Sequence, residues 1–124
     1  MDMAALEPVE QRECDPAESH DGQSVAAVPL NAARIEEASR MFRALGDAAR
    51  LRLLAHLLPG DRCVGDLAEL EGEALPTISQ RLKILYSEKI LRRRRLGKHV
   101  SYGLADRHIT ELVSNALAHA SEEE

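Results

Sequence analysis

Residues 63–104 read CVGDLAELEGEALPTISQRLKILYSEKILRRRRLGKHVSYGL, and this stretch decides the fold. Two short amphipathic segments, Cys63–Leu70 and Leu75–Tyr86, flank a turn that contains Gly72. Pro76 stands in the first turn of the second segment, where its missing N–H has no helical partner to lose. Two short helices across a tight turn predict a helix-turn-helix.

Two strand-like runs follow the second helix, Ile90–Arg95 and His99–Leu104, and Gly97 between them permits a tight turn. They predict a β-hairpin, or wing, with Lys98 at its tip. Side chains alternate along a strand, so Arg92–Arg95 place two guanidinium groups on each face. Such a density of charge favours contact with phosphate over simple solvation.

Two further helices are predicted upstream of residue 63. Asn31 can cap the first, which carries apolar side chains at helical spacing and ends at Gly46. Asp47 can cap the second, whose leucines point to the centre of the core and which stops at Pro59.

The last predicted helix starts near Asp106 and has an apolar face that needs a partner. This face comprises Ile109, Leu112, Val113, Ala116, Leu117 and Ala120. The predicted fold is mainly α with a small β-hairpin, a winged helix-turn-helix of order α-α-α-α-β-β-α. We expect a homodimer formed through the first and last helices.

The composition bounds the rest of the chain. With 124 residues and few aromatic side chains, one domain with a Leu, Ile, Val and Ala core is expected, which favours helices. Residues 1–30 predict a flexible acidic arm, 31–121 the DNA-binding and dimerisation domain, and 122–124 an acidic tail. No bilayer-spanning stretch or signal peptide is recognisable, so we expect a cytoplasmic protein with no membrane partner.

The distribution of charge points to a nucleic-acid partner although the net charge is −5. Residues 1–30 carry a net charge of −6, whereas residues 75–100 carry +7. Arg and Gln can bind guanine and adenine edges, and Ser and Thr can bind bases or phosphates. A polar helix face alone is more often merely solvated, but the adjoining arginine-rich wing favours DNA. The predicted DNA-binding residues are Thr77, Ser79, Gln80, Arg81, Lys83, Arg93, Arg94, Arg95 and Lys98.

The last helix also carries nitrogen and oxygen donors suited to zinc or cobalt: Asp106, His108, His119 and Glu122. The two histidines are 11 residues apart, which returns them to nearly the same helix face but about 16 Å apart along the axis. A tetrahedral ion needs every donor atom about 2 Å away. The donors of one site must therefore come from two chains. Each residue alone has a simpler explanation, such as helix capping by Asp106.

The chain resembles the ArsR/SmtB family of metal-sensing repressors across residues 31–122. The likeness rests on ALGDAARLRLL at 44–54, CVGDLA at 63–68, ISQRL at 78–82 and GKHVSY at 97–102. It implies that Asp106, His108, His119 and Glu122 bind zinc, with cobalt, cadmium or nickel as alternatives. It also implies that the metal-free dimer binds an inverted-repeat operator and that metal releases it, which derepresses metal efflux or sequestration genes.

A second metal site is predicted from Cys63 and Asp66, together with Cys14 and His20 of the arm. Thiolate ligands favour softer ions such as cadmium, lead or zinc. Some relatives use two arm ligands here, but His20 follows Cys14 by six residues, where a zinc-sensing relative has four. Other arm residues that can substitute are Asp15, Glu18 and Asp21. His56 and His99 are interpreted as structural or close to phosphate.

Three alternatives remain open at this point. Cys14 and Cys63 suit a repressor of the same fold that is switched by redox chemistry, and two cysteines without an export signal argue against a structural disulfide. A small zinc hydrolase is disfavoured because no HExxH helix or nucleophile motif is present. An arginine-rich protein-interaction module is the third. For metal sensing, we expect His119 to donate its second ring N–H toward the connection near Lys89.

Overall fold

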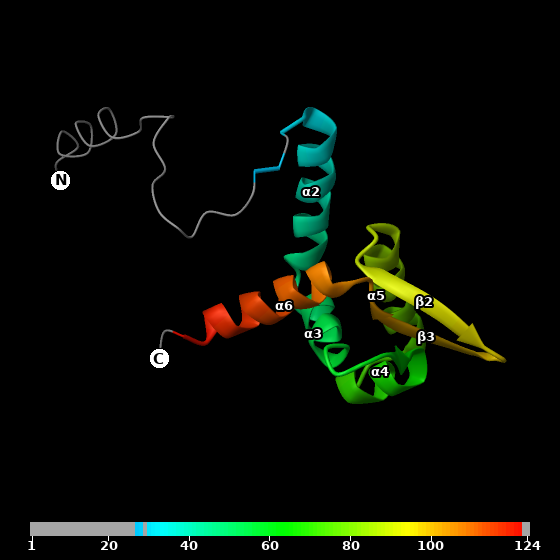
Figure 1. Cartoon of the computed structure of the whole chain (residues 1–124). Helices are drawn as coiled ribbons and strands as arrows, with labels where there is room; N and C mark the ends of the chain where they lie inside the picture. The colour runs from blue at the N-terminus through cyan, green and yellow to red at the C-terminus, as the bar shows by residue number, and fades with distance from the viewer. Residues whose placement is uncertain (1–26, 29, 123–124) are drawn as a thin grey trace, which may run out of the picture. The chain divides into compact units, whose positions relative to one another are not determined.

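The computed structural model describes residues 27, 28 and 30–122. Cys14, His20, the rest of residues 1–26 and the last two acidic residues lie outside the described residues. Within this part, no helix is both long and apolar enough to cross a bilayer. The elements (Figure 1) are α2 (Ala32–Leu45), α3 (Ala48–His56), β1 (Arg62–Cys63), α4 (Val64–Glu71), α5 (Leu75–Ser87), β2 (Leu91–Leu96), β3 (His99–Leu104) and α6 (Arg107–Ala120).

The predicted winged helix-turn-helix is confirmed, and the sheet has one strand more than expected. β1 pairs antiparallel with β3, opposite Tyr102 and Ser101, which gives the strand order β1-β3-β2. Cys63 was expected to begin a helix but lies in β1, and α4 starts one residue later. The extended backbone of Cys63, with φ −83° and ψ 164°, serves both the strand pair and the N-cap position.

The predicted helix starts are confirmed by side-chain caps. Asn31 accepts a hydrogen bond from the Arg34 N–H at 2.8 Å, and Asp106 accepts one from the Ile109 N–H at 3.1 Å. Asp47 accepts from Arg50 N–H at 3.0 Å, and this bond holds the pKa of its carboxyl below the ordinary range. Each cap satisfies a backbone N–H that has no partner within its own helix.

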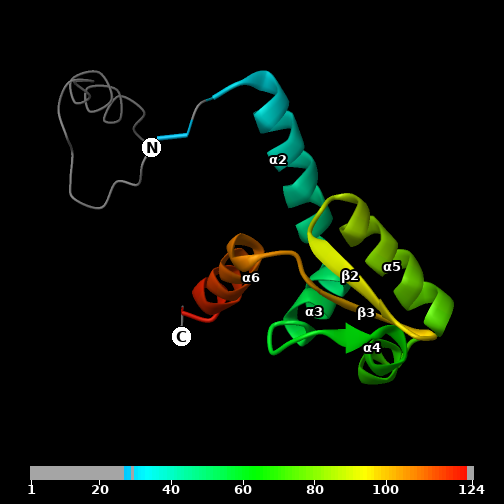
Figure 2. The same cartoon turned by 45° about the vertical axis from the view of Figure 1, so that its right-hand side comes forward.

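The core lies where α3, α4, α5 and α6 meet the base of the wing (Figure 2). It consists mainly of aliphatic side chains, as the composition predicts, and also includes Tyr102. The large side chains that are almost completely buried are Leu53, Leu54, Leu57, Leu67, Ile78, Leu82, Leu85, Ile90 and Val113. The two helices of the helix-turn-helix, α4 and α5, are thereby fixed against α3.

Glu71, the last residue of α4, ties this helix to α3. Its side chain is only 7% exposed, and its two carboxylate oxygens lie 2.9 Å from Arg52 Nε and 2.7 Å from His56 Nε2. The hydrogen bond from Arg52 and then that from His56 lower the pKa of Glu71. The interpretation of His56 as a structural residue is thus supported by its contact.

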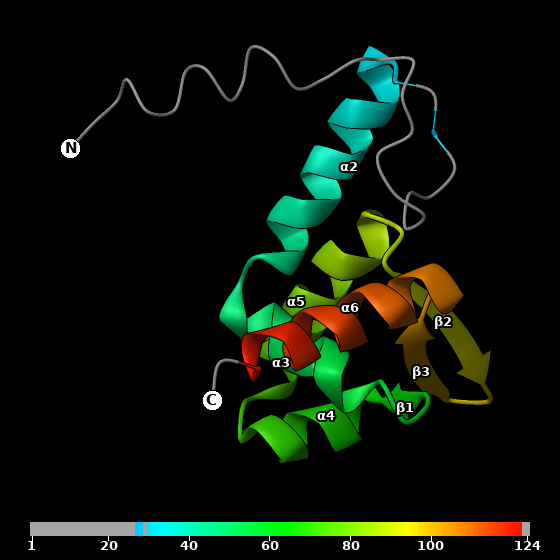
Figure 3. The same cartoon turned by 60° about the vertical axis from the view of Figure 1, so that its left-hand side comes forward.

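Two apolar faces are left uncovered within the described chain. The N-terminal half of α2 extends beyond the other helices (Figures 1 and 3). Along α2, Ile35 and Phe42 are 51% and 57% exposed. On α6, Leu112 and Leu117 are only partly buried against the core. Both helices therefore present apolar surface that the described residues do not cover.

We predict that Glu71→Gln lowers the free energy of unfolding at neutral pH by about 1.5–3 kcal/mol, because it removes charge-assisted hydrogen bonds. The pKa of Glu71 is depressed from 4.5, so its contribution is present above that pH and is lost as pH falls through the folded-state pKa. Urea unfolding at fixed protein concentration should show the difference between wild type and variant shrinking in acid. Glu69→Gln on the exposed side of α4 is the control, and an equal loss there contradicts the prediction.

Candidate nucleic-acid interface and metal-donor pairs

The predicted groove-reading residues of α5 do not all lie on an open surface. Gln80 and Lys83 are exposed, while Thr77 and Ser79 are half-buried. All four remain accessible on the side of α5 away from its buried leucines, as an amphipathic helix requires. Their role in DNA binding stays a prediction.

Arg81 lies differently from the expected outward orientation. Its side chain is 23% exposed and its Nη2 lies 3.6 Å from Glu73 Oε2 in the turn between α4 and α5. Its Nη1 is buried and has no hydrogen-bond partner among the described residues. The long side chain folds back over the helix-turn-helix because Glu73 lies within its reach. Arg81 therefore links α5 to the turn between α4 and α5 through its ion pair with Glu73.

The four consecutive arginines of β2 fall into different environments. Arg92 Nη2 forms an ion pair of 2.9 Å with Asp61 Oδ1, in the loop before β1. Gly103 stands opposite Arg92 in the sheet, and a Cβ at that position would collide with the Asp61 carboxylate. The absence of a side chain at residue 103 is thus what allows this pair to form.

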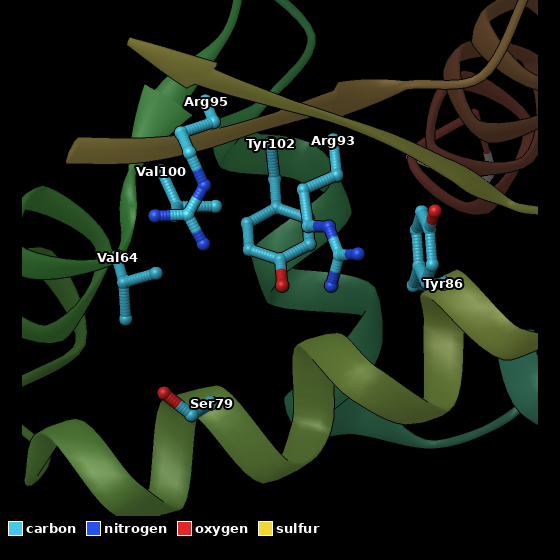
Figure 4. Close-up of a pocket in the computed structure, with 7 residues that line it drawn as sticks. All are labelled: Val64, Ser79, Tyr86, Arg93, Arg95, Val100 and Tyr102. Atoms are coloured by element: carbon cyan, nitrogen blue, oxygen red, sulfur yellow. The ribbon is translucent and has the colours of Figure 1, made fainter. Parts of the chain in front are cut away.

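Arg93 and Arg95 lie on the face of β2 that is turned toward α5 (Figure 4). The Arg93 guanidinium lies over the Tyr86 ring, 4.5 Å from its centroid, and Tyr86 meets Tyr102 edge-on at 6.4 Å. The two arginines hang over a cleft of about 430 Å³ between the wing and α5. The residues lining it are Val64, Ser79, Tyr86, Arg93, Arg95, Val100 and Tyr102.

Arg94 and Lys98, the remaining predicted wing contacts, are exposed. Arg94 lies on the opposite face of β2 from Arg93 and Arg95 because side chains alternate. Lys98 belongs to a two-residue turn with Gly97, whose φ of 62° a glycine adopts freely, and Leu96 pairs with His99. The hairpin is therefore tighter than the three-residue connection expected from the sequence.

The second predicted metal site is only half described. Cys63 is half-buried with no disulfide partner among the described residues, and Asp66 is exposed in the first turn of α4. Their proposed partners Cys14 and His20 lie outside the described residues. Cys63 also lines a shallow cavity that reaches Ser79 and the wing tip at Lys98 and His99.

The four predicted donors of the last helix form two pairs at its opposite ends. At the start of α6, His108 Nδ1 lies 3.7 Å from Asp106 Oδ1, and at its end His119 Nδ1 lies 3.8 Å from Glu122 Oε1. The side chains of both pairs are 58–87% exposed. Nowhere in residues 30–122 do three His, Cys, Asp or Glu side chains meet in a way that could hold a metal ion. Each of these pairs therefore offers two possible donors, and the described residues of one chain bring no third donor to either pair.

The chemistry of these pairs fits zinc. Each combines an imidazole nitrogen with a carboxylate oxygen, and two such pairs supply the four N and O ligands of a tetrahedral site. Asp106 uses Oδ1 to cap α6, which leaves Oδ2 for a metal ion. Capping and ligation are thus compatible, since a carboxylate has two oxygens.

The first donor pair is connected to the base of the wing. Asp106 follows β3 after a single residue, Ala105, whose N–H donates a 2.9 Å hydrogen bond to the Ile90 carbonyl. Lys89, with the left-handed φ of 64°, precedes Ile90 and its Nζ lies 3.7 Å from Glu37 Oε2 on α2. The sequence analysis does not predict the contact between Glu37 and Lys89. The available signal was that Glu37 carries the charge opposite to that of Lys89 and stands on another predicted helix.

Tyr86 and Asp61 are two further residues that the sequence did not indicate as part of the interface. Tyr86 lies near the end of α5, and the sequence indicates it only as the boundary of the predicted helix, although only two tyrosines occur in the chain. Asp61 pairs with an arginine 31 residues away. Neither partnership has a local sequence signal.

Comparison with known proteins places this fold and charge pattern. No protein-family model matches the chain. A transcriptional repressor SmtB homolog of Synechocystis sp. is 36% identical over 87 residues, which cover 70% of this chain and 66% of that protein. A cadmium resistance transcriptional regulatory protein CadC homolog of Staphylococcus aureus is 34% identical over 87 residues, covering 69% and 72%. The chain belongs to the ArsR/SmtB family of transcriptional regulators.

A solved ArsR/SmtB-type structure agrees with this assignment. The homodimeric winged helix-turn-helix DNA-binding domain Mb0332 of Mycobacterium bovis has a TM-score of 0.70 and 30% identity, over 73% of this chain and 84% of that one. The match spans 66% of the SmtB homolog, just under two thirds of its length. Membership of the ArsR/SmtB family confirms the predicted fold and the prediction that the chain is not an enzyme.

We predict that Arg93 and Tyr86 stabilise the domain jointly. The unfolding free energies of wild type, Arg93→Gln, Tyr86→Leu and the double variant should give a coupling of about 0.5–1 kcal/mol, as expected for a cation over an aromatic ring. Urea denaturation at one protein concentration measures it. The cycle with Arg94→Gln in place of Arg93→Gln should show no coupling, and equal coupling in both cycles would refute the contact.

Proposed function

We propose that the chain is a metal-responsive transcriptional repressor, which binds an inverted-repeat operator when metal-free and is released by zinc. The observation that carries this proposal is the pair of exposed histidine and carboxylate groups at each end of α6, on a domain whose wing carries four arginines. Its expected place is the cytoplasm and the genes it would control are those of metal efflux or sequestration.

The uncovered apolar faces support a homodimer through α2 and α6. Ile35 and Phe42 are exposed seven residues apart on one face of α2, and α6 offers Leu112 and Leu117. Burying these side chains against a second copy would remove apolar surface from water, which is the main favourable term in association. A two-fold axis then presents two wings and two α5 helices to one operator.

In such a dimer an antiparallel pair of α6 helices brings unlike ends together. Asp106 and His108 of one protomer would share an ion with the partner's His119 and Glu122, and symmetry generates two equivalent sites. Zinc bound there supplies a fixed tetrahedral link between two chains. Cobalt, cadmium and nickel are alternatives for the same donors, and the names of similar proteins refer to cadmium resistance and to antimony specificity.

The regulatory coupling would run through the start of α6. Because Asp106 is joined to β3 through Ala105, whose N–H is bonded to Ile90, a change in the direction of α6 moves the base of the wing. The partner's His119, when its one ring nitrogen binds the ion, has a second N–H to donate near Lys89. A bound metal ion would then favour one relative orientation of the two DNA-binding regions of the dimer, each formed by α4, α5 and the wing of one protomer. The coupling free energy between metal binding and DNA binding would be of order 1–3 kcal/mol.

We predict that His119→Gln preserves operator binding and abolishes its release by zinc. The measurement is fluorescence anisotropy of a labelled operator duplex during zinc titration. Glu122→Gln should weaken release, whereas Glu111→Gln, on the same helix and paired with Arg107 at 3.6 Å, should not. Cys63→Ser in the same titration separates the alternatives: loss of release there, with release intact in His119→Gln, would assign sensing to the second site or to redox chemistry.

A mixed dimer tests whether the site is shared between chains. Combining a His108→Ala chain with a His119→Ala chain leaves one site complete and removes both histidines from the other. The heterodimer, isolated with two different affinity tags, should bind one zinc per dimer with wild-type affinity, while either homodimer should bind weakly. Uniformly weak binding in the heterodimer would mean that each chain forms its own site.

A further inference from the structure

We propose that the cleft between α5 and the wing is a binding site for one DNA backbone phosphate, held by Arg93 and Arg95 with Ser79. This inference rests on the proposed DNA-binding function and assigns separate roles to neighbouring arginines. Arg93 and Arg95 enter the cleft from β2, and Ser79 enters it from α5 (Figure 4). The cleft is thus built from both elements that are expected to contact DNA.

Among the described residues, no carboxylate compensates the positive charge of the cleft. Two guanidinium groups line it, and the other lining residues are apolar, aromatic or hydroxyl-bearing, with no carboxylate among the described residues that form its wall. Arg92, by contrast, is neutralised by Asp61 at 2.9 Å. Two neighbouring positive charges that line one cleft favour the binding of an anion there. A planar guanidinium can donate two parallel hydrogen bonds to the oxygens of a phosphodiester.

Arg93 is held ready for such a contact. Its guanidinium lies over the Tyr86 ring at 4.5 Å, which fixes its plane while leaving its charge and its N–H groups in place. Tyr86 is in turn fixed by its edge-on contact with Tyr102. A pre-positioned donor loses less conformational entropy when the anion binds than a free surface arginine does.

The position of the cleft explains which phosphate it would take. Ser79 lies next to Gln80, which is exposed on the face of α5 expected to enter the major groove. A phosphate bound beside Ser79 would lie at the edge of that groove, between the bases contacted by α5 and the strand crossed by the wing. Phosphate contacts of this kind fix the register of a protein on DNA without reading sequence themselves.

The neighbouring residue provides the matched control. Arg94 and Arg95 are adjacent, both exposed and both on β2, but they point to opposite faces of the sheet. Arg94→Gln and Arg95→Gln remove the same charge from nearly the same place. Any long-range electrostatic effect on DNA binding therefore appears in both variants, and the phosphate that each variant no longer contacts distinguishes the cleft from the opposite face of the wing.

The test measures how DNA affinity depends on salt. The probe is a fluorescein-labelled duplex that the metal-free wild-type protein selects from a random-sequence pool, with thermal unfolding used to confirm that both variants fold. Each phosphate contact contributes about 0.9 to the slope of log K against log salt, so loss of the cleft contact from both protomers in Arg95→Gln should reduce a dimer's slope by up to about 1.8 relative to wild type. A slope for Arg95→Gln equal to that of wild type overturns the proposal.

Methylphosphonate substitution locates the phosphate. Replacing single phosphates in one half-site by uncharged methylphosphonate should reveal one position that weakens binding of wild type and of Arg94→Gln more than binding of Arg95→Gln. The absence of any such position also overturns the cleft assignment. These failures are distinguishable from failure of the proposed function, because a wild-type protein that selects no duplex at all would refute the repressor itself.

Discussion

The rigidity of one helix is the constraint on which the proposed sensor depends. A helix rises 1.5 Å per residue, so the two donor pairs of α6 are held about 16 Å apart whatever the side chains do. Each pair consists of one histidine and one carboxylate within 4 Å of each other. Neither pair fills a tetrahedral shell alone. In the proposed sensor, metal binding and association of two chains would therefore be coupled, and the apparent affinity for metal would rise with the concentration of the chain.

Strand β3 connects the wing to the start of α6. β3 is paired with β1 on one side and with β2 on the other, and it leads through Ala105 into the capped start of α6. Tyr102 on this strand packs against Tyr86 of α5. In the proposed sensor, a rotation of α6 would be transmitted to the wing and to the end of α5 through these covalent and packed connections.

Much of this architecture was predictable from sequence because the relevant signals are local. The side chains of Asn31, Asp47 and Asp106 each accept a hydrogen bond from the N–H three residues later. Gly97 allows the tight hairpin turn because it adopts a positive φ. β1 was not predictable, because a strand of two residues owes its existence to Tyr102 and Ser101, far along the chain. The inward fold of Arg81 likewise depends on Glu73 across a turn, which no helical periodicity reveals.

The candidate site shows the same division. The donor pairs on α6 follow from spacing within one helix, and the structure places each pair together. The different environments of the four arginines could not be predicted from local spacing, because they depend on Asp61 and Tyr86, which lie outside β2. Gly103 then acquires a meaning beyond its place in β3. The charge that the wing presents depends on the space that Gly103 leaves for the Asp61 carboxylate as well as on the number of basic residues, because a side chain at residue 103 would displace Asp61 from Arg92. A neutral substitution there would therefore change how the positive charge of the wing is compensated without changing the number of its arginines.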